Sequence, residues 1–579
     1  MLPEKKWLIV FVVLSLLNPL YYVFSMLTTP YVFTGGWDDA NLLTTMHSVN
    51  WNLQSPWIIE NINYGDVLHG AGVFGPPFIF IPLGILALLL SIDPFIIYLI
   101  AKFVFSFLFL LVAYNFFKFI EKKLKIDANI NMFVYVFCAG LGGLFYLIFM
   151  IFFDPTNILT PHPMRGFGIS AFRYLEYIYY PLGLATAMLS IIYIMKNKTI
   201  ISGIFLGLTA LFYPLYGFAT FVILFIYKII FKNNFIKTIL TLIIILGIFA
   251  LPWIILYQQP YFLNLYSAAM RTGTGIEFLP TLLVGIIIPL FFILFNKINF
   301  KKDVIMIVLW IISIILYSIG QLTQTTWVDV GLRSIKDYCL LFELPLLLLL
   351  IKILYSTWFE ENKEKKFIYV TTIVFAILCL APNHLVFWMP GKILTFFWIP
   401  LSISTAMGII EFSKKYKISV RKILSVIFIL ILPTLFFFYC FMYNAPQTLN
   451  FYGFKKDVYS FGFPREEFDA MNFLKTQPDG VVLASHEIGT WLPVFSNKKT
   501  LLGSYTELDV LNYTQKLSDY EKFYSQPSKE ILKKYNITYV FYGYNEMKFN
   551  STINFESLSY LEKIYQNNNI KIFKVIDRT

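Results

Sequence analysis

The sequence has little charge. Only 14% of its 579 residues are Asp, Glu, Lys or Arg, whereas 58% are hydrophobic and the mean hydropathy is +0.67. A soluble protein of this length needs more charge to cover its surface, so the composition argues against an ordinary globular enzyme. The formal net charge of +12 does not indicate nucleic acid as a partner, because the lysines stand in short clusters between apolar runs.

Cysteine is scarce as well. The four cysteines are Cys138, Cys339, Cys379 and Cys440, which lie in or beside apolar runs, and none belongs to a CxxC pair. This pattern indicates neither a disulfide framework nor a zinc site. Internal repeats and low-complexity tracts are also missing. The first apolar run lacks a small-residue cleavage site, which favours a membrane helix over a signal peptide.

Long apolar runs fill the first three quarters of the chain. Fourteen segments are apolar enough for a bilayer, in which a spanning helix takes about 20 residues. They are residues 7–27, 76–92, 95–120, 131–153, 174–195, 199–212, 214–231, 238–256, 279–295, 304–320, 338–355, 367–381, 393–411 and 423–443. The pattern predicts a polytopic α-helical membrane protein whose transmembrane domain covers residues 1–443.

The basic residues predict which side of the membrane each loop faces. Twenty Lys and Arg lie in one alternate set of loops, which includes the N-terminus, and six lie in the other set. The first set is therefore predicted to be cytoplasmic, as in a multi-pass plasma-membrane protein. Only one crossing fits between the outer loop 28–75 and the basic cluster 121–125, and we assign it to 95–120. Segment 76–92 then becomes re-entrant or juxtamembrane, and about thirteen crossings place the C-terminus outside.

The tail at 444–579 has mixed polarity and is predicted to be an extracytoplasmic soluble α/β domain. Strand-like runs cover 481–484, 538–542 and 570–575. Helical patterns cover 465–475, 509–524 and 528–535, and turns are expected at 478–480 and Gly543.

An acidic pair follows the first predicted helix, in Gly35-Gly36-Trp37-Asp38-Asp39-Ala40. Carboxylates there can bind a divalent cation, or one of them can take a proton from an attacking hydroxyl. Adjacent like charges also raise one pKa, which suits a base. The alternative is structural, because Asp is a favoured residue at the start of a helix.

Isolated cations lie in the predicted outer loops, close to apolar runs. They are Arg165, Arg173, Arg333, Lys336 and Lys392, and Asp154 ends a predicted crossing beside the first two. Arg and Lys at this depth are suited to the phosphate of an outer-leaflet lipid. The alternative is that each is an interfacial anchor. Within the runs, Lys102 and Glu343 are among the clearest charges, and such residues are costly unless they serve a function.

The strand expected at 481–484 runs into Ser485-His486-Glu487-Ile488-Gly489. A polar turn after a strand is a common place for a binding loop. No nucleophile elbow surrounds Ser485, so a hydrolase triad is not supported.

This layout resembles the GT-C superfamily of membrane glycosyltransferases. The resemblance rests on Asp38-Asp39 after the first helix, on Gly75-Pro76-Pro77 at the start of an apolar segment, on Asp154, and on the outer α/β domain. It implies a sugar donor on a polyprenyl phosphate, inverting transfer, and Asp38 as the general base with Asp39 second. It also implies a possible Mg or Mn ion at Asp38 and Asp154. The five isolated cations would bind the donor phosphate.

The same resemblance bears on the acceptor. Oligosaccharyltransferases read a peptide sequon with a Trp-Trp-Asp-Tyr-Gly motif, and the matching stretch here keeps only Glu487 and Gly489. Peptide-sequon recognition is therefore not expected. His486 and Glu487 become candidate acceptor-binding residues, and the acceptor itself, whether glycan, lipid or protein, stays open.

Two other functions fit the same composition. A transporter or flippase for a lipid-linked sugar or other amphiphile would share the helices and the outer cations, but usually shows internal repeats. A non-catalytic envelope assembly protein would act through its tail. Only the enzyme requires a carboxylate at Asp38 beside an outer cavity.

Overall fold

The computed structural model describes residues 3–28, 31–33, 46, 59–60, 67–68, 77–137, 178–231, 234–257, 361–380, 390–430, 432, 462–503, 513–549 and 553–576. Contacts divide the chain into two compact units. The first unit comprises residues 1–11, 106–175 and 180–444, and the second comprises residues 12–105, 176–179 and 445–579. The second unit thus joins the C-terminal tail to part of the predicted membrane region, and the boundary expected at residue 444 stays a prediction.

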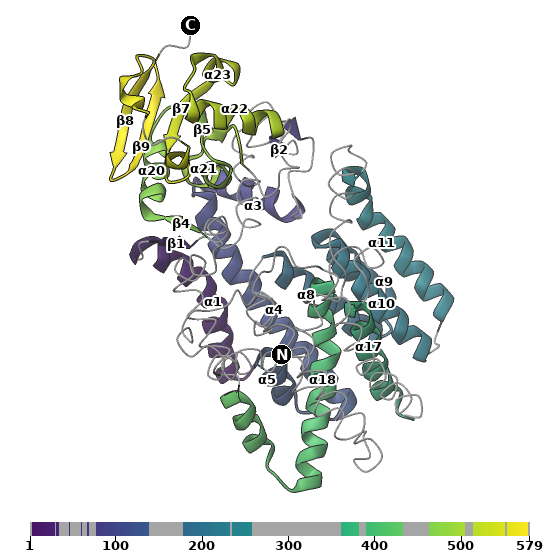
Figure 1. Cartoon of the computed structure of the whole chain (residues 1–579). Coiled ribbons are helices and arrows are strands. Elements are labelled where there is room, and N and C mark those ends of the chain that lie inside the picture. Colours follow the sequence, from purple (N-terminus) through teal and green to yellow (C-terminus); the bar gives the residue numbers. More distant parts are fainter. Residues whose placement is uncertain are drawn as a thin grey trace, which may run out of the picture. The chain divides into compact units, whose positions relative to one another are not determined.

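The described part of the first unit is helical (Figure 1). It contains the C-terminal half of α4 (Pro94–Leu124), α5 (Ala128–Phe137), α8 (Tyr179–Met195), α9 (Thr199–Phe212), α10 (Pro214–Phe231), α11 (Phe235–Tyr257), α17 (Lys363–Leu380) and α18 (Pro390–Tyr416). Each helix coincides with an apolar run. The boundary between α9 and α10 has a simple cause: Tyr213 is extended, as a residue before proline prefers, and Pro214 opens the next helix.

Four helices in the described ranges are long and apolar enough to cross a membrane. They are Pro94–Leu124, Pro214–Phe231, Phe235–Pro252 and Thr395–Tyr416. The chain is therefore a membrane protein with several apolar helices, and the full set of about thirteen crossings stays a prediction. Helix α3 (Pro77–Leu90) has 14 residues. At about 21 Å it is shorter than the roughly 30 Å hydrocarbon core, which fits the re-entrant or juxtamembrane placement of this segment.

Small residues allow close helix packing in the first unit. A Cβ atom at Gly203 of α9 would lie 2.5 Å from Ile245 of α11, and one at Gly207 would lie 2.3 Å from Phe249. Glycines one turn apart let membrane helices approach closely, because little hydrophobic force holds helices together in lipid. Larger side chains at either position would push α9 and α11 apart.

Hydrogen bonds between helices add specificity to this packing. Ser190 of α8 and Ser202 of α9 are fully buried, and each hydroxyl donates to the other residue's carbonyl oxygen at 2.8 Å. The Trp398 indole of α18 donates to the carbonyl oxygen of Tyr135 in α5 at 2.8 Å. Such bonds satisfy polar groups that lipid cannot solvate.

In the second unit, α3 and α4 meet at a turn that the sequence explains. Asp93 is the N-cap of α4, and its side chain accepts a hydrogen bond from the Phe95 N–H at 2.9 Å. Pro94 follows at the first helical position, where its missing N–H costs nothing. The Asp93-Pro94 pair therefore ends one apolar run and starts the next.

Lys102 lies about two and a half turns further along α4, and it is 1% exposed. Its ammonium group donates to the Tyr22 hydroxyl of α1 (Lys5–Thr28) at 2.9 Å. The same group lies 4.6 Å from the centre of the Tyr22 ring and 5.1 Å from that of Tyr98. Aromatic faces attract a cation most strongly when water is absent, so the two tyrosines stabilise this buried charge.

The C-terminal domain is built on a five-stranded sheet in the order β6-β5-β7-β9-β8 (yellow and green in Figure 1). The strands are β5 (Val481–Leu483), β6 (Lys499–Thr500), β7 (Ile537–Tyr542), β8 (Leu561–Asn567) and β9 (Ile570–Val575). β5 pairs in parallel with β6 and β7, whereas β9 pairs antiparallel with β7 and β8. The accompanying helices are α20 (Arg465–Lys475), α21 (His486–Ser496), α22 (Tyr513–Ser525) and α23 (Lys529–Lys534).

The expected α/β domain is thus present, with helices on a five-stranded sheet. Its predicted strands match β5, β7 and β9, and its first predicted helix matches α20 residue for residue. Strands β6 and β8 and helix α21 were not predicted from the sequence. The core is apolar and aromatic, with Leu483, Phe523, Val540 and Phe573 at most 1% exposed.

Two features join this domain to the rest of the second unit. β1 (Tyr31–Phe33) pairs antiparallel with β4 (Gly462–Pro464), which leads directly into α20. At the end of α20, the Lys475 ammonium forms an ion pair with the Asp93 carboxylate at the α3–α4 turn. An exposed pair of this kind contributes at most about 1 kcal/mol, so it orients the domain more than it stabilises it.

Candidate functional site

The parallel strands β5 and β7 end at the same edge of the C-terminal sheet. In open α/β sheets the carboxyl ends of parallel strands are the usual place for a ligand. Ser485, His486 and Glu487 follow β5, while Gly543, Asn545 and Glu546 follow β7. Side chains distant in sequence therefore meet at this edge.

Glu546 connects the two strand ends. Its carboxylate is fully buried, and one oxygen accepts the Ser485 N–H at 2.6 Å and the Tyr520 hydroxyl at 3.1 Å. The other oxygen accepts the Gly543 N–H at 2.9 Å. Three donors on one buried carboxylate fix the loop after β5 against the loop after β7.

Burial and hydrogen bonding act on this carboxylate in opposite directions. Burial raises the pKa of Glu546 above its ordinary value, and the hydrogen bonds from its own N–H and from Ser485, Gly543 and Tyr520 only partly lower it. Burial, followed by the charge of Glu546, also raises the pKa of the Tyr520 hydroxyl well above its ordinary value. Tyr520 therefore keeps its proton at neutral pH and remains a donor to Glu546.

Asn545 extends this arrangement towards the surface. Its side-chain N–H₂ donates to the Ser485 hydroxyl at 3.2 Å and to the Glu487 carboxylate at 3.3 Å. The Lys548 ammonium donates to the Asn545 side-chain oxygen. We call Ser485, Glu487, Asn545, Glu546 and Lys548 the strand-end network. It presents a half-buried carboxylate and a cation on a buried, rigid base.

His486 and Glu487, the predicted acceptor-binding residues, occupy the first turn of α21 and are both half-buried. Ser485 caps this helix, because its hydroxyl accepts the Ile488 N–H at 3.4 Å. The structure places Glu487 in the strand-end network. Glu546 and Asn545 were not predicted from the sequence, in which their one signal is a polar Gly-Tyr-Asn-Glu turn directly after a strand.

Gly489, the residue shared with the oligosaccharyltransferase motif, has a packing role here. A Cβ atom at this position would lie 1.7 Å from the carbonyl oxygen of Leu502, which no side chain tolerates. The reverse contact is similarly close, because a Cβ at Gly503 would lie 2.5 Å from the Gly489 oxygen. Glycine is therefore required for α21 to sit against the turn that follows β6.

Most of the other predicted site residues lie outside the described residues. These are Asp38, Asp39, Asp154, Arg165, Arg173, Arg333 and Lys336. Lys392 lies near the start of α18, and its side chain is likewise outside what the structure describes. Among the described residues, no group of three or more His, Cys, Asp or Glu is arranged to hold a metal ion. The predicted Mg or Mn site at Asp38 and Asp154 stays a prediction.

No known protein family matches the sequence, and no curated protein matches it. Among solved structures, the chain is similar to the oligosaccharyltransferase of Archaeoglobus fulgidus tethered with an acceptor peptide, at 13% identity and a TM-score of 0.43, over 94% of this chain and 70% of that one. It is similar to the same organism's AglB in complex with an inhibitory peptide and a dolichol-phosphate, at 13% identity and a TM-score of 0.42, over 93% and 69%.

A third similar structure is the mycobacterial arabinofuranosyltransferase AftD, at 11% identity and a TM-score of 0.48. All of this chain aligns there, but with only 40% of AftD. The names of these neighbours are those of glycosyltransferases, and the GT-C resemblance expected from the sequence stays a prediction at this level of similarity. Because identities and TM-scores this low do not establish a shared activity, the function rests on the residues of this chain.

Proposed function

We propose that this chain is a membrane glycosyltransferase that moves a sugar from a polyprenyl-phosphate donor to an acceptor on the outer face of the membrane. The observation that carries the proposal is the strand pair β1–β4 in the second unit. Phe33 ends β1, and Asp38 follows it by five residues in the sequence. Five residues span at most about 18 Å, and Phe33 pairs with Gly462 of β4, which leads directly into the C-terminal domain.

The proposed chemistry is an inverting displacement. Asp38 takes the proton of the acceptor hydroxyl as that oxygen bonds to the anomeric carbon. The bond from this carbon to the phosphate oxygen breaks, and the polyprenyl phosphate leaves with the electron pair. Arg165, Arg173, Arg333, Lys336 and Lys392 are proposed to bind that phosphate, where negative charge develops in the transition state. Asp39 is the second candidate for the base, and no step is routed through a metal ion.

His486 and Glu487 are proposed to bind the acceptor at the strand-end network. A half-buried carboxylate beside Asn545 and Lys548 is suited to hydroxyl or amine groups, which donate hydrogen bonds to it. Because Glu546 fixes the base of this network, Glu487 keeps its position without help from the acceptor. Such preorganisation reduces the entropy that binding must otherwise lose.

The test uses the full chain reconstituted in nanodiscs, with a panel of synthetic polyprenyl-phosphate sugars as donors. The readout is release of polyprenyl phosphate, together with the anomeric configuration of any product determined by NMR. Asp38→Asn should lower the rate about 10²–10⁴-fold while donor binding is kept, because general-base catalysis has that magnitude.

Glu562→Gln on exposed β8 serves as the matched carboxylate-to-amide control and should leave the rate unchanged. Wild-type rates in the Asp38→Asn protein would remove Asp38 from the mechanism. If the donor is instead moved across the membrane intact, the chain is a transporter and the enzyme proposal fails.

A further inference from the structure

In the first unit, the parallel helices α9 and α11 pack side by side. The close contacts Gly203–Ile245 and Gly207–Phe249 join residues that are 42 positions apart, so α9 and α11 run in the same direction. The same offset places Thr199, the first residue of α9, level with Thr241, so α11 begins six residues earlier, or about 9 Å. One pocket is nevertheless lined by the first residues of both helices, so the positive ends of both helix dipoles border it, and neither helix has an acidic residue in its first turn.

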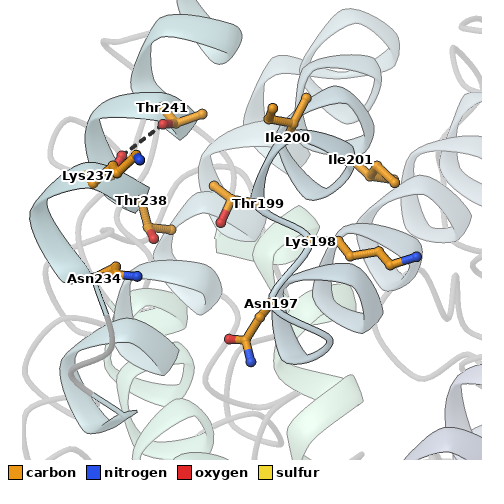
Figure 2. Close-up of a pocket in the computed structure, with 9 residues that line it drawn as sticks. All are labelled: Asn197, Lys198, Thr199, Ile200, Ile201, Asn234, Lys237, Thr238 and Thr241. Atoms are coloured by element: carbon orange, nitrogen blue, oxygen red, sulfur yellow. Dashed lines mark hydrogen bonds between the residues drawn. The ribbon is translucent and has the colours of Figure 1, made fainter.

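A pocket of about 530 Å³ opens between these two helix starts (Figure 2). None of the described residues that line it is acidic. Its polar lining consists of Asn197, Lys198, Thr199, Asn234, Lys237, Thr238 and Thr241. Within the described part of the chain, neither lysine forms an ion pair. Two cations, two helix starts and three hydroxyls make this pocket suited to an anion.

Thr238 is the residue that points to a ligand. It is 4% exposed, yet its hydroxyl has no hydrogen-bond partner among the described residues. Other buried helical threonines bond to the carbonyl oxygen four residues earlier, as Thr220 does to Tyr216 and Thr371 to Phe367, both at 2.7 Å. In Figure 2, Thr238 and Thr199 face the space between the two helix starts. Thr238 is buried but lines the pocket, so an occupant of the pocket can accept a hydrogen bond from its hydroxyl.

The surroundings of the pocket indicate what kind of anion it binds. Ile200 is 65% exposed and Ile236 is 72% exposed, and both lie within one or two residues of the pocket lysines. Further along α11, Leu240, Ile244 and Ile248 are each more than half exposed. On a membrane helix such a stripe faces lipid, so acyl chains would lie directly beside the pocket.

We infer that this pocket binds the phosphate head group of an anionic phospholipid, whose acyl chains lie along α9 and α11. The charge pattern predicts these helix starts to be cytoplasmic, so the lipid belongs to the leaflet opposite the proposed donor site. Thr199 and Thr238 donate hydrogen bonds to the phosphate oxygens. Lys198 is exposed, and its long side chain, drawn extended in Figure 2, can rotate towards the head group.

The test measures lipid retention by the detergent-solubilised full chain with native mass spectrometry. The probes are dioleoylphosphatidylglycerol, which carries a net negative charge, and dioleoylphosphatidylcholine, which is neutral. The wild-type protein should retain the anionic lipid. The double variant Lys198→Ala, Lys237→Ala should bind it about thirtyfold more weakly, because each lysine near a lipid head group contributes about a fivefold factor. Thr238→Val, which keeps the shape of the side chain, should weaken binding about fivefold.

The matched control is Lys122→Ala, Lys123→Ala, which removes two exposed lysines at the end of α4 in the same unit. It should leave retention unchanged. Equal retention of the two lipids by the wild type, or an equal loss in this control, would overturn the proposal. Inorganic phosphate is added in a third arm. Displacement of phosphatidylglycerol by millimolar phosphate would show a site for free phosphate and would also overturn it.

Discussion

Glu546→Gln is the sharpest perturbation of the candidate site. The Glu546 carboxylate accepts three hydrogen bonds from other residues, with the Ser485 N–H and the Tyr520 hydroxyl on one oxygen and the Gly543 N–H on the other. Glutamine has the same shape but replaces one oxygen with an N–H₂ group. In either orientation of the amide, one buried backbone N–H then faces another donor. Leaving such a group unsatisfied costs about 1–3 kcal/mol.

Hydrogen exchange measures this loss where it occurs. The backbone N–H groups of Ser485 and Gly543 donate to Glu546 and should be protected in the wild-type protein. In the Glu546→Gln variant the protection of these two amides should fall about 5- to 150-fold. A cost of about 1–3 kcal/mol in the closed state raises the equilibrium constant for local opening by that factor. Glu562→Gln makes the identical chemical change on exposed β8 and should leave both amides unchanged. Unaltered protection in Glu546→Gln would show that the carboxylate does not hold the two loops together.

The pH dependence tests the electrostatic part of the argument. Because burial raises the pKa of Glu546 above its ordinary value of 4.5, the folded state binds the proton more tightly than the unfolded chain. The contribution of Glu546 to stability is then complete below about pH 4.5 and is lost as the pH rises through the raised pKa. Glutamine does not titrate, so the stability advantage of the wild type over Glu546→Gln should narrow with rising pH. An advantage that widens instead would show that the hydrogen bonds outweigh burial.

Two further predictions concern the same domain. Gly489→Ala should lower the melting temperature of this domain by several degrees, because the new Cβ would lie 1.7 Å from a main-chain oxygen. Its control is Gly247→Ala on α11, where a Cβ has nothing within 4 Å, so the change should be neutral or slightly stabilising. Equal melting temperatures for the two variants would contradict the packing argument. Burial acts to raise the pKa of Asp519, but hydrogen bonds from Lys534 and Tyr535 outweigh it and hold the pKa below its ordinary 3.8. Asp519→Asn should therefore destabilise the domain by about 1–2 kcal/mol at pH 7, as measured by denaturant unfolding. This difference in stability should disappear as the pH falls below the lowered pKa of Asp519.

Much of the helical architecture could be predicted because apolar length and proline position are local signals. The expected runs 199–212 and 214–231 coincide with α9 and α10, and Asp93-Pro94 marks the start of α4. The tail was harder to predict. Strand β8 was hard to predict because its buried and exposed residues alternate only weakly. The turn that joins β8 to β9 could have indicated a hairpin, because it is rich in asparagine and Asn568 has a φ of 49°, a backbone conformation that asparagine tolerates.

The candidate site was only half predictable, for a physical reason. His486 and Glu487 stand out in sequence because they follow a strand-like run directly. Glu546 lies about sixty residues further on, and nothing near it in the sequence shows that its carboxylate is buried. Its role depends on β5 and β7 being parallel neighbours, and pairing between distant strands leaves no local trace.

The second unit links β1 and the start of α4 to the C-terminal α/β domain. Asp93 caps α4 and pairs with Lys475, while β1, which precedes the acidic pair in sequence, is hydrogen-bonded to β4. Neither contact is strong alone, since the ion pair is exposed and the strand pair is three residues long. Their arrangement matters more, because both hold elements of the N-terminal region against the same α/β domain. The proposed enzyme needs such a link to bring a carboxylate near β1 to an acceptor held by the domain, whereas the alternative, a transporter, does not.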